Sequence, residues 1–155
     1  MKKKRINTIK AFLLCAILLT LIFIFVQSMI PAEKSSEQSN IVGDIIEEII
    51  PPETKPGEFV QTNLRKLAHF FEFAVLGAEV AVYVCLFMRK ASIVSLSYIT
   101  ALTVALCDET IQIFSGRGPS VRDVWIDFSG FVFASAVIYA VAVIIFLMQR
   151  KTKKN

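Results

Sequence analysis

The chain has 155 residues, enough for one domain, and 55% of them are hydrophobic, with a mean hydropathy of +0.61. These values are too high for an ordinary soluble core and indicate a membrane protein. The formal net charge of +4 does not indicate nucleic-acid binding, because the basic residues flank apolar stretches and so reflect membrane orientation.

Four apolar stretches are long enough to cross a bilayer, since about twenty helical residues span its ~30 Å hydrocarbon layer. We predict an all-α membrane protein, one domain over residues 1–155, with spans at about residues 11–30, 67–88, 91–113 and 124–148. The first stretch is either a retained anchor or a cleaved signal peptide. Its length, and the lack of a clear small-x-small cleavage site after it, favour the anchor.

Basic residues precede the first span, separate the second from the third, and follow the fourth. They are Lys2, Lys3, Lys4, Arg5 and Lys10; Arg89 and Lys90; and Arg150, Lys151, Lys153 and Lys154. Positive residues stay on the cytoplasmic side. We therefore predict that both termini are cytoplasmic and that residues 31–65 and 114–123 face outward.

Residues 31–65 form the extended extracytoplasmic segment. Its first part, PAEKSSEQSN, is typical of a flexible loop. The following NIVGDIIEEII has isoleucines at helical spacing opposite acids, and Pro51-Pro52 ends it, so we predict a short amphipathic helix. It would lie either on the outer membrane surface or against the bundle, and its acidic polar face favours the bundle.

Small residues recur four positions apart in two of the spans. Gly77 with Ala81, and Gly130 with Ala134, have the spacing that lets membrane helices approach closely. The signal has low specificity, and it predicts close helix packing at these positions.

Ionisable and amide side chains gather toward the outer ends of the last three spans. They come from three regions: Arg65, Lys66, His69 and Glu72; Asp108, Glu109 and Gln112; and Arg117, Arg122, Asp123 and Asp127. His69 and Glu72 are i, i+3. Asp108 with Gln112, and Asp123 with Asp127, are i, i+4, so the members of each pair lie on one helix face. A charge facing lipid costs about 2.5 kcal/mol or more at the bilayer centre, so we expect these faces to point inward, toward one another.

The loop before the fourth span has its own pattern. Ser120 followed by Asp123 matches a capping box and predicts a helix start at Val121. Glycines and Pro119 predict a tight turn, which would hold Arg117 and Arg122 near the helix start. Guanidinium groups beside a helix N-terminus favour phosphate or carboxylate ligands.

Two segments carry a resemblance to a known family. RKLAHFFEFAVLG and DETIQIFSGRGPSVRDVWIDFSG resemble the signature segments of the VanZ family, over Lys66 to Gly130. The resemblance implies a small multi-pass protein of the bacterial cell membrane, and founding members are associated with resistance to teicoplanin-type glycopeptides. The residues shared with the family by motif position are Lys66, His69, Glu72, Asp108, Glu109, Gln112, Arg117, Asp123 and Asp127.

The chain departs from the family pattern at two positions. Family members often have His where Ile111 stands and a second Gly near Ala134. His69 is therefore the sole imidazole of the chain. This weakens a metal or two-histidine mechanism, and we predict no metal site and no cofactor.

We divide the polar residues into two candidate sets. The candidate catalytic residues are His69, Glu72, Asp108 and Glu109, because an imidazole oriented by a carboxylate is a general base near neutral pH. The candidate ligand-binding residues are Lys66, Gln112, Arg117, Arg122, Asp123 and Asp127. The alternative for both sets is a purely structural network of ion pairs that closes the outer mouth of the bundle.

Three functional hypotheses follow. The first is an outward-facing pocket that binds a lipid-linked cell-wall precursor, a glycopeptide antibiotic or a lipid headgroup, with membrane lipids as surroundings. The second is an interfacial enzyme, a hydrolase or transferase acting on a lipid-linked or peptidyl substrate. The third, a transporter using Glu79 as a proton-coupled group, lacks a polar path below Glu79. The sequence does not indicate an oligomeric state.

Overall fold

The computed structural model describes residues 2–51, 53–88, 90–118 and 120–152. These residues form five α-helices and no strand, which confirms the predicted all-α class. The helices are α1 (Lys2–Met29), α2 (Ala32–Glu47), α3 (Lys55–Tyr83), α4 (Ala91–Phe114) and α5 (Val121–Thr152), and a π-helical turn, η1 (Val84–Met88), ends α3. The predicted roles of Pro52, Arg89, Pro119, Lys153 and Lys154 concern residues outside the described ranges.

Four helical segments are long and apolar enough to cross a membrane, as predicted. They are Lys4–Met29, Lys55–Met88, Ala91–Phe114 and Val121–Thr152. The second begins well before residue 67 because Thr54 caps it. The Gly57 N–H donates to Thr54 Oγ1 at 3.2 Å, and Pro56 occupies the first turn, where its missing N–H costs nothing.

The prediction of a loop over PAEKSSEQSN is wrong, because α2 begins at Ala32 and includes it. The serines there satisfy their hydroxyls within the helix. Ser36 donates to the Ala32 carbonyl at 2.9 Å and Ser39 to the Ser35 carbonyl at 3.0 Å. Polar composition alone therefore does not break the helix in this segment.

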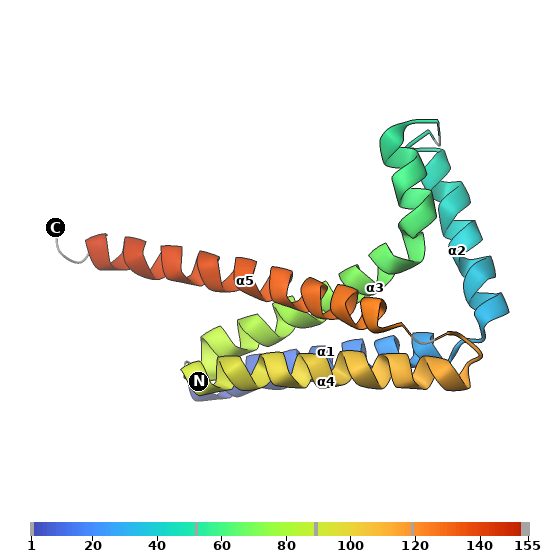
Figure 1. Ribbon diagram of the computed structural model, residues 1–155. Coiled ribbons are helices and arrows are strands. Elements are labelled where there is room, and N and C mark those ends of the chain that lie inside the picture. The colour runs from blue at the N-terminus through green and yellow to red at the C-terminus, as the bar shows by residue number, and fades with distance from the viewer. Residues whose placement is uncertain (1, 52, 89, 119, 153–155) are drawn as a thin grey trace.

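Helix α2 and the first part of α3 form a hairpin that rises away from the other helices (Figure 1). A contact between the side chains of Gln61 and Glu47 joins its two arms, and Gly43 faces Leu64. The apolar residues Ile41 and Ile45 of α2 remain exposed. The amphipathic helix thus packs on the extension of α3 and not along the bundle.

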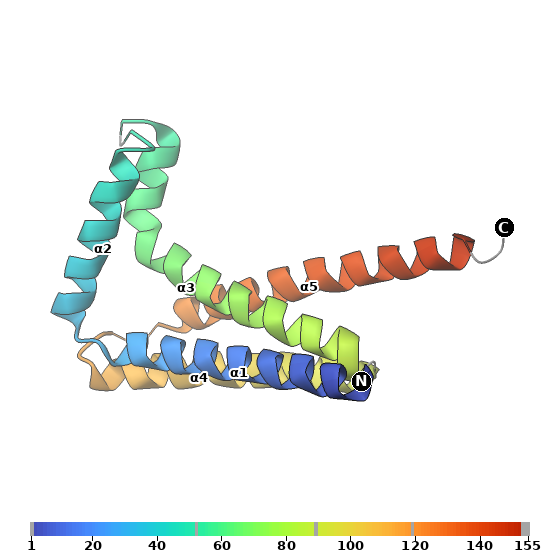
Figure 2. The same cartoon turned by 180° about the vertical axis from the view of Figure 1, so that it is seen from behind.

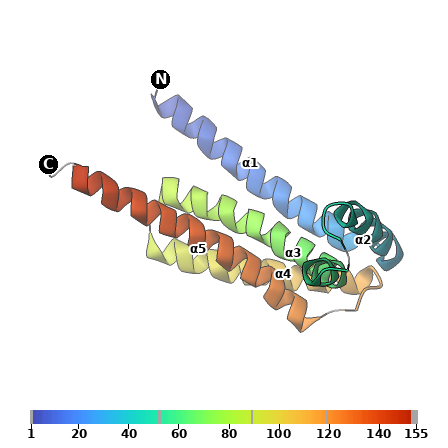
Figure 3. The same ribbon diagram turned by 90° about the horizontal axis from the view of Figure 1, so that it is seen from above.

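The chain crosses the molecule four times in alternating directions. The N-terminus, the α3–α4 connection and the C-terminal end of α5 lie at one end, and the α2–α3 hairpin and the α4–α5 loop lie at the other (Figures 1 and 2). Helix α1 diverges from α3 toward its N-terminus (Figure 3). The buried core lies where the helices converge and consists of Ile24, Phe73, Leu76, Ala101, Ala105, Val124 and Phe131.

Two glycines allow α3 and α5 to cross in close contact, as the small-residue spacing predicts. A Cβ on Gly77 would lie 2.8 Å from Phe131 Cα and even closer to its carbonyl oxygen, and a Cβ on Gly130 would collide with the Phe70 carbonyl. These neighbours are backbone atoms, which cannot move aside cheaply. The crossing therefore requires glycine at both positions.

This crossing determines the geometry of the polar end. His69 directly precedes Phe70, and Asp127 lies one helical turn before Gly130. Because Phe70 and Gly130 are in backbone contact, the His69 and Asp127 side chains are brought together between α3 and α5. A larger residue at the crossing would separate them.

Candidate functional site

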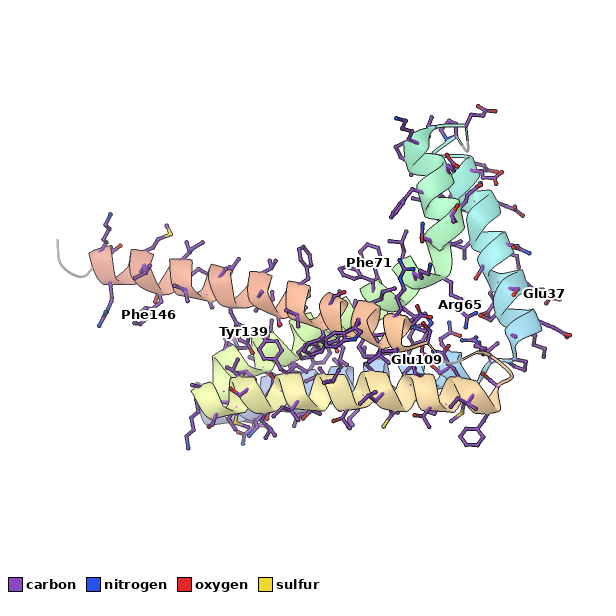
Figure 4. All side chains as sticks on the ribbon, in the orientation of Figure 1. Glu37, Arg65, Phe71, Glu109, Tyr139 and Phe146 are labelled. Atoms are coloured by element: carbon purple, nitrogen blue, oxygen red, sulfur yellow. The ribbon has the colours of Figure 1, made fainter. Side chains whose placement is uncertain are left out.

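A group of polar side chains occupies the end of the bundle where α1 and α4 end, α5 begins and α3 passes between them. We call it the polar cluster: Ser28, Arg65, His69, Glu72, Asp108, Glu109, Gln112, Arg117 and Asp127. Figure 4 shows Arg65 and Glu109 near this junction, whereas Tyr139 and Phe146 lie far along α5.

Asp108 is the centre of the hydrogen-bonded part of the cluster. Its side chain is fully buried, 0% exposed. One carboxylate oxygen contacts the Ser28 hydroxyl of α1, and the other accepts from Gln112 Nε2 at 2.8 Å. Gln112 Nε2 also donates to Glu109 Oε1 at 3.1 Å, and the side-chain Oε1 of Gln112 accepts from Arg65 at 3.2 Å. The cluster thus joins α1, α3 and α4.

His69 lies between two buried carboxylates without a hydrogen bond to either. Its Nδ1 is 3.7 Å from Asp108 Oδ2 and 3.6 Å from Asp127 Oδ1, longer than the roughly 3.2 Å limit of an ordinary hydrogen bond. Among the described residues, neither His69 Nδ1 nor either oxygen of the fully buried Asp127 has a hydrogen-bond partner.

The turn after α4 positions Arg117. Gly116 has φ 73°, the left-handed conformation that favours glycine. The Gly116 N–H donates to the Ile113 carbonyl at 3.3 Å and the Arg117 N–H to the Gln112 carbonyl at 3.1 Å, which together form a Schellman motif. The motif turns the chain back over the helix end, so that the next side chain points into the molecule.

Arg117 is almost completely buried, 8% exposed, and donates to the Gln27 carbonyl of α1 at 3.3 Å. Burial, and to a smaller extent the charge of Arg65, lower the pKa of the Arg117 guanidinium. An arginine nevertheless remains charged in a protein. Its Nε is buried and has no hydrogen-bond partner among the described residues, so it can still donate to a ligand.

Glu109 caps the start of α5. Helix α5 begins at Val121, as the capping pattern predicts. The Ser120 N–H, which a capping box would give to Asp123 within the same helix, instead donates to Glu109 Oε2 of α4 at 2.8 Å. The helix start is therefore held by a neighbouring helix.

Two cavities border the cluster, and three residues line both: Arg65, His69 and Arg117. The first cavity, about 160 Å³, lies among α1, α2 and α3 and also includes Glu72. The second, about 370 Å³, is bounded by α3 and the α4–α5 loop and also includes Lys66 and Asp123. The two arginines therefore face open space on both sides, with buried carboxylates behind them.

Most of the residues singled out from the sequence lie at this end of the bundle. His69, Glu72, Asp108, Glu109, Gln112, Arg117 and Asp127 are in the cluster, and Lys66 and Asp123 line the second cavity. Arg122, expected beside Arg117, is exposed on the first turn of α5. Gln27, Ser28 and Arg65 were not chosen as site residues. Gln27 and Ser28 are two polar residues at the end of an otherwise apolar span. This pattern could have indicated that α1 contributes to the site.

These features define a multi-pass helical membrane protein with a buried ionisable cluster at one end. The family model described as VanZ/LLP1 matches residues 12–148, so the chain belongs to the VanZ/LLP1 family. No curated protein and no solved structure matches the chain.

Proposed function

We propose that this protein is a cell-envelope membrane protein whose cavities face outward and bind the anionic group of a lipid-linked envelope precursor. The observation that carries the proposal is that two cavities share Arg65, His69 and Arg117. Through such a ligand, the protein would contribute to resistance against teicoplanin-type glycopeptides, which act on envelope precursors.

The distribution of charge supports an outward-facing site. The basic residues Lys4, Arg5, Lys10, Arg150 and Lys151 belong to the opposite ends of α1 and α5. Because basic flanks stay in the cytoplasm, the cavity end faces the exterior, and both termini are cytoplasmic.

The lining of the first cavity supports an amphiphilic ligand. Arg65 and Arg117 supply guanidinium groups, which pair with phosphate and carboxylate through two parallel hydrogen bonds. Val42, Leu64 and Ala68 supply an apolar wall of the same cavity. A lipid with a phosphate or carboxylate headgroup satisfies both kinds of surface, whereas a fully polar solute leaves the apolar wall unused.

The test is binding of a lipid-linked precursor to the purified protein, together with teicoplanin susceptibility of cells that express it. We expect Arg117→Gln to weaken binding about tenfold to a hundredfold, since a hydrogen bond to a charged group contributes about 1.5–3 kcal/mol. Susceptibility should rise in parallel. Arg122→Gln tests separately the sequence-based expectation for Arg122, and we expect little change because that side chain is exposed.

Two results would count against this proposal. One is unchanged precursor binding in Arg117→Gln protein that is still inserted and folded. The other is equal weakening in Arg117→Gln and Arg122→Gln, which would indicate a general charge effect and not the cavity.

The second candidate is an interfacial hydrolase or transferase acting on a lipid-linked or peptidyl substrate. The observation that favours it is the position of His69, which lines both cavities while its Nδ1 faces the carboxylates of Asp108 and Asp127. Carboxylates in this position can fix the orientation of an imidazole ring. Mass analysis of precursors from cells with wild-type or His69→Ala protein tests this candidate, because catalysis, unlike binding, leaves a chemically altered product.

A further inference from the structure

We infer that His69, Asp108 and Asp127 form a binding site for a divalent transition-metal ion of the Zn²⁺ or Mn²⁺ type. The inference goes beyond the proposed function and does not depend on it, because it concerns the protein without any envelope ligand. It also revises the expectation of no metal site from the sequence, which grouped His69 with Glu72, Asp108 and Glu109 and placed Asp127 in the ligand-binding set.

The distances within the triad fit a shared ion better than direct hydrogen bonds. One ligand atom from each of the three residues lies within 4.8 Å of the others. The His69 Nδ1 is 3.6 Å from Asp127 Oδ1 and 3.7 Å from Asp108 Oδ2. Two ligands that are each about 2.1 Å from one zinc ion lie about 3.4 Å apart at the tetrahedral angle. The two His69 separations are close to this value, and the ligand atoms of Asp108 and Asp127 lie within 4.8 Å of each other.

Asp127 provides the independent observation that points to a ligand. Its side chain is 0% exposed, and neither carboxylate oxygen has a hydrogen-bond partner among the described residues. Burying a carboxylate without a partner is costly. A cation at the centre of the triad would satisfy Asp127 and His69 Nδ1 together, and it would also offset the repulsion between Asp127 and Asp108.

The surroundings of Asp108 resemble the support that metal ligands receive in proteins, where a ligating carboxylate is itself hydrogen-bonded. Ser28 contacts one of its oxygens and Gln112 donates to the other. The three ligands come from three different helices, and the glycine contacts between α3 and α5 hold two of those helices at a fixed distance.

The donor set indicates the class of ion. Mg²⁺ and Ca²⁺ prefer oxygen ligands alone, whereas an imidazole nitrogen with two carboxylates suits Zn²⁺ or Mn²⁺. Two carboxylates also balance a charge of 2+. Because His69 lines both cavities, the ion would be within reach of a molecule bound there.

The experiment uses the full chain purified in detergent and stripped with a chelator. Zn²⁺, Mn²⁺ and, for comparison, Mg²⁺ are titrated by competition with a chromophoric chelator, and bound metal is measured by elemental analysis. We expect about one Zn²⁺ or Mn²⁺ per chain and much weaker binding of Mg²⁺. Asp127→Asn and His69→Gln should each reduce affinity by about tenfold or more.

Glu79→Gln is the matched control. It removes a partly buried carboxylate of α3 that lies about 15 Å along the helix from His69 and outside the triad. It should bind metal like the wild type. If Asp127→Asn does not fold, the comparison is made between the wild type and His69→Gln. Saturating Zn²⁺ should raise the melting temperature of the wild type and leave that of His69→Gln unchanged. Absence of Zn²⁺ and Mn²⁺ binding in the wild type, or binding that survives both ligand substitutions, overturns the inference.

Discussion

The two halves of α5 have similar apolar composition and different surroundings. In the first half, Val124, Asp127, Gly130, Phe131 and Ser135 are buried against α3 and α4. In the second half, large apolar residues are exposed on every side of the helix, among them Val141, Ile144, Phe146, Leu147 and Met148. The first half is fixed by contacts that few other residues could make, whereas the second meets the apolar surroundings that a membrane supplies.

This difference has a physical cause. Membrane helices do not gain from burying apolar side chains against one another, because lipid tails are equally apolar, so close packing and polar contacts decide where helices associate. Both are concentrated at the cluster end, in the Gly130 contact with Phe70 and in the bond network around Asp108. Sensitivity to substitution should therefore fall along α5.

The largest effect should come from Gly130→Leu. The new side chain would collide with the Phe70 backbone, and we expect a loss of about 3 kcal/mol or more in the free energy of unfolding, the upper range for overpacking. Unfolding in detergent, followed by circular dichroism, measures it. Gly43→Ala on α2 is the control, because its Cβ would meet only Leu64 at 3.9 Å. Equal stability of both variants would contradict the conclusion that the α3–α5 crossing requires glycine at position 130.

An intermediate effect is expected for Ser28→Ala. The substitution removes the hydroxyl that contacts the buried Asp108 carboxylate, and we expect a loss of about 2 kcal/mol, typical of a hydrogen bond to a charged group. Ser36→Ala removes an exposed hydroxyl that bonds only within α2 and should change stability little. The same unfolding measurement compares the two. A negligible effect of Ser28→Ala would show that α1 does not stabilise the cluster.

The smallest effects are expected for isoleucine-to-valine substitutions, which compare a buried core position with a lipid-facing position. Ile24 is 0% exposed and Ile144 is 56% exposed. We expect Ile24→Val to cost about 1 kcal/mol and Ile144→Val less than about 0.5 kcal/mol. Thermal unfolding of both variants in the same detergent provides the comparison. A reversed order would mean that the end of α5 is packed against another surface in the intact protein.

Much of the architecture followed from the sequence because its signals are local. Long, mostly apolar stretches identified the four spans, and Ser120 identified the start of α5. The early start of α3 has a local signal in Thr54 and Pro56, which the prediction of a span from residue 67 did not use. For α2, polar residues concealed a helix whose serine hydroxyls are satisfied by its own backbone.

The sequence predicted where the site lies but not which of its side chains contact one another. Helical spacing placed His69, Asp108 and Asp127 on inward faces, yet which of them meet depends on the rotation of three helices. That rotation is set by the backbone contact at Gly130 and by the turn at Gly116. The small-residue spacing predicted close packing at Gly130 but not which residue it would contact. The same holds for Arg122, whose exposure follows from the direction in which α5 leaves its cap.

The bond between Glu109 and the Ser120 N–H couples two helices mechanically. The amide of Ser120, the residue before α5, is satisfied by a side chain of α4, so sliding one helix past the other would separate this donor from the Glu109 carboxylate. Opening the loop side of the second cavity therefore requires either breaking this bond or moving the end of α4 together with the start of α5.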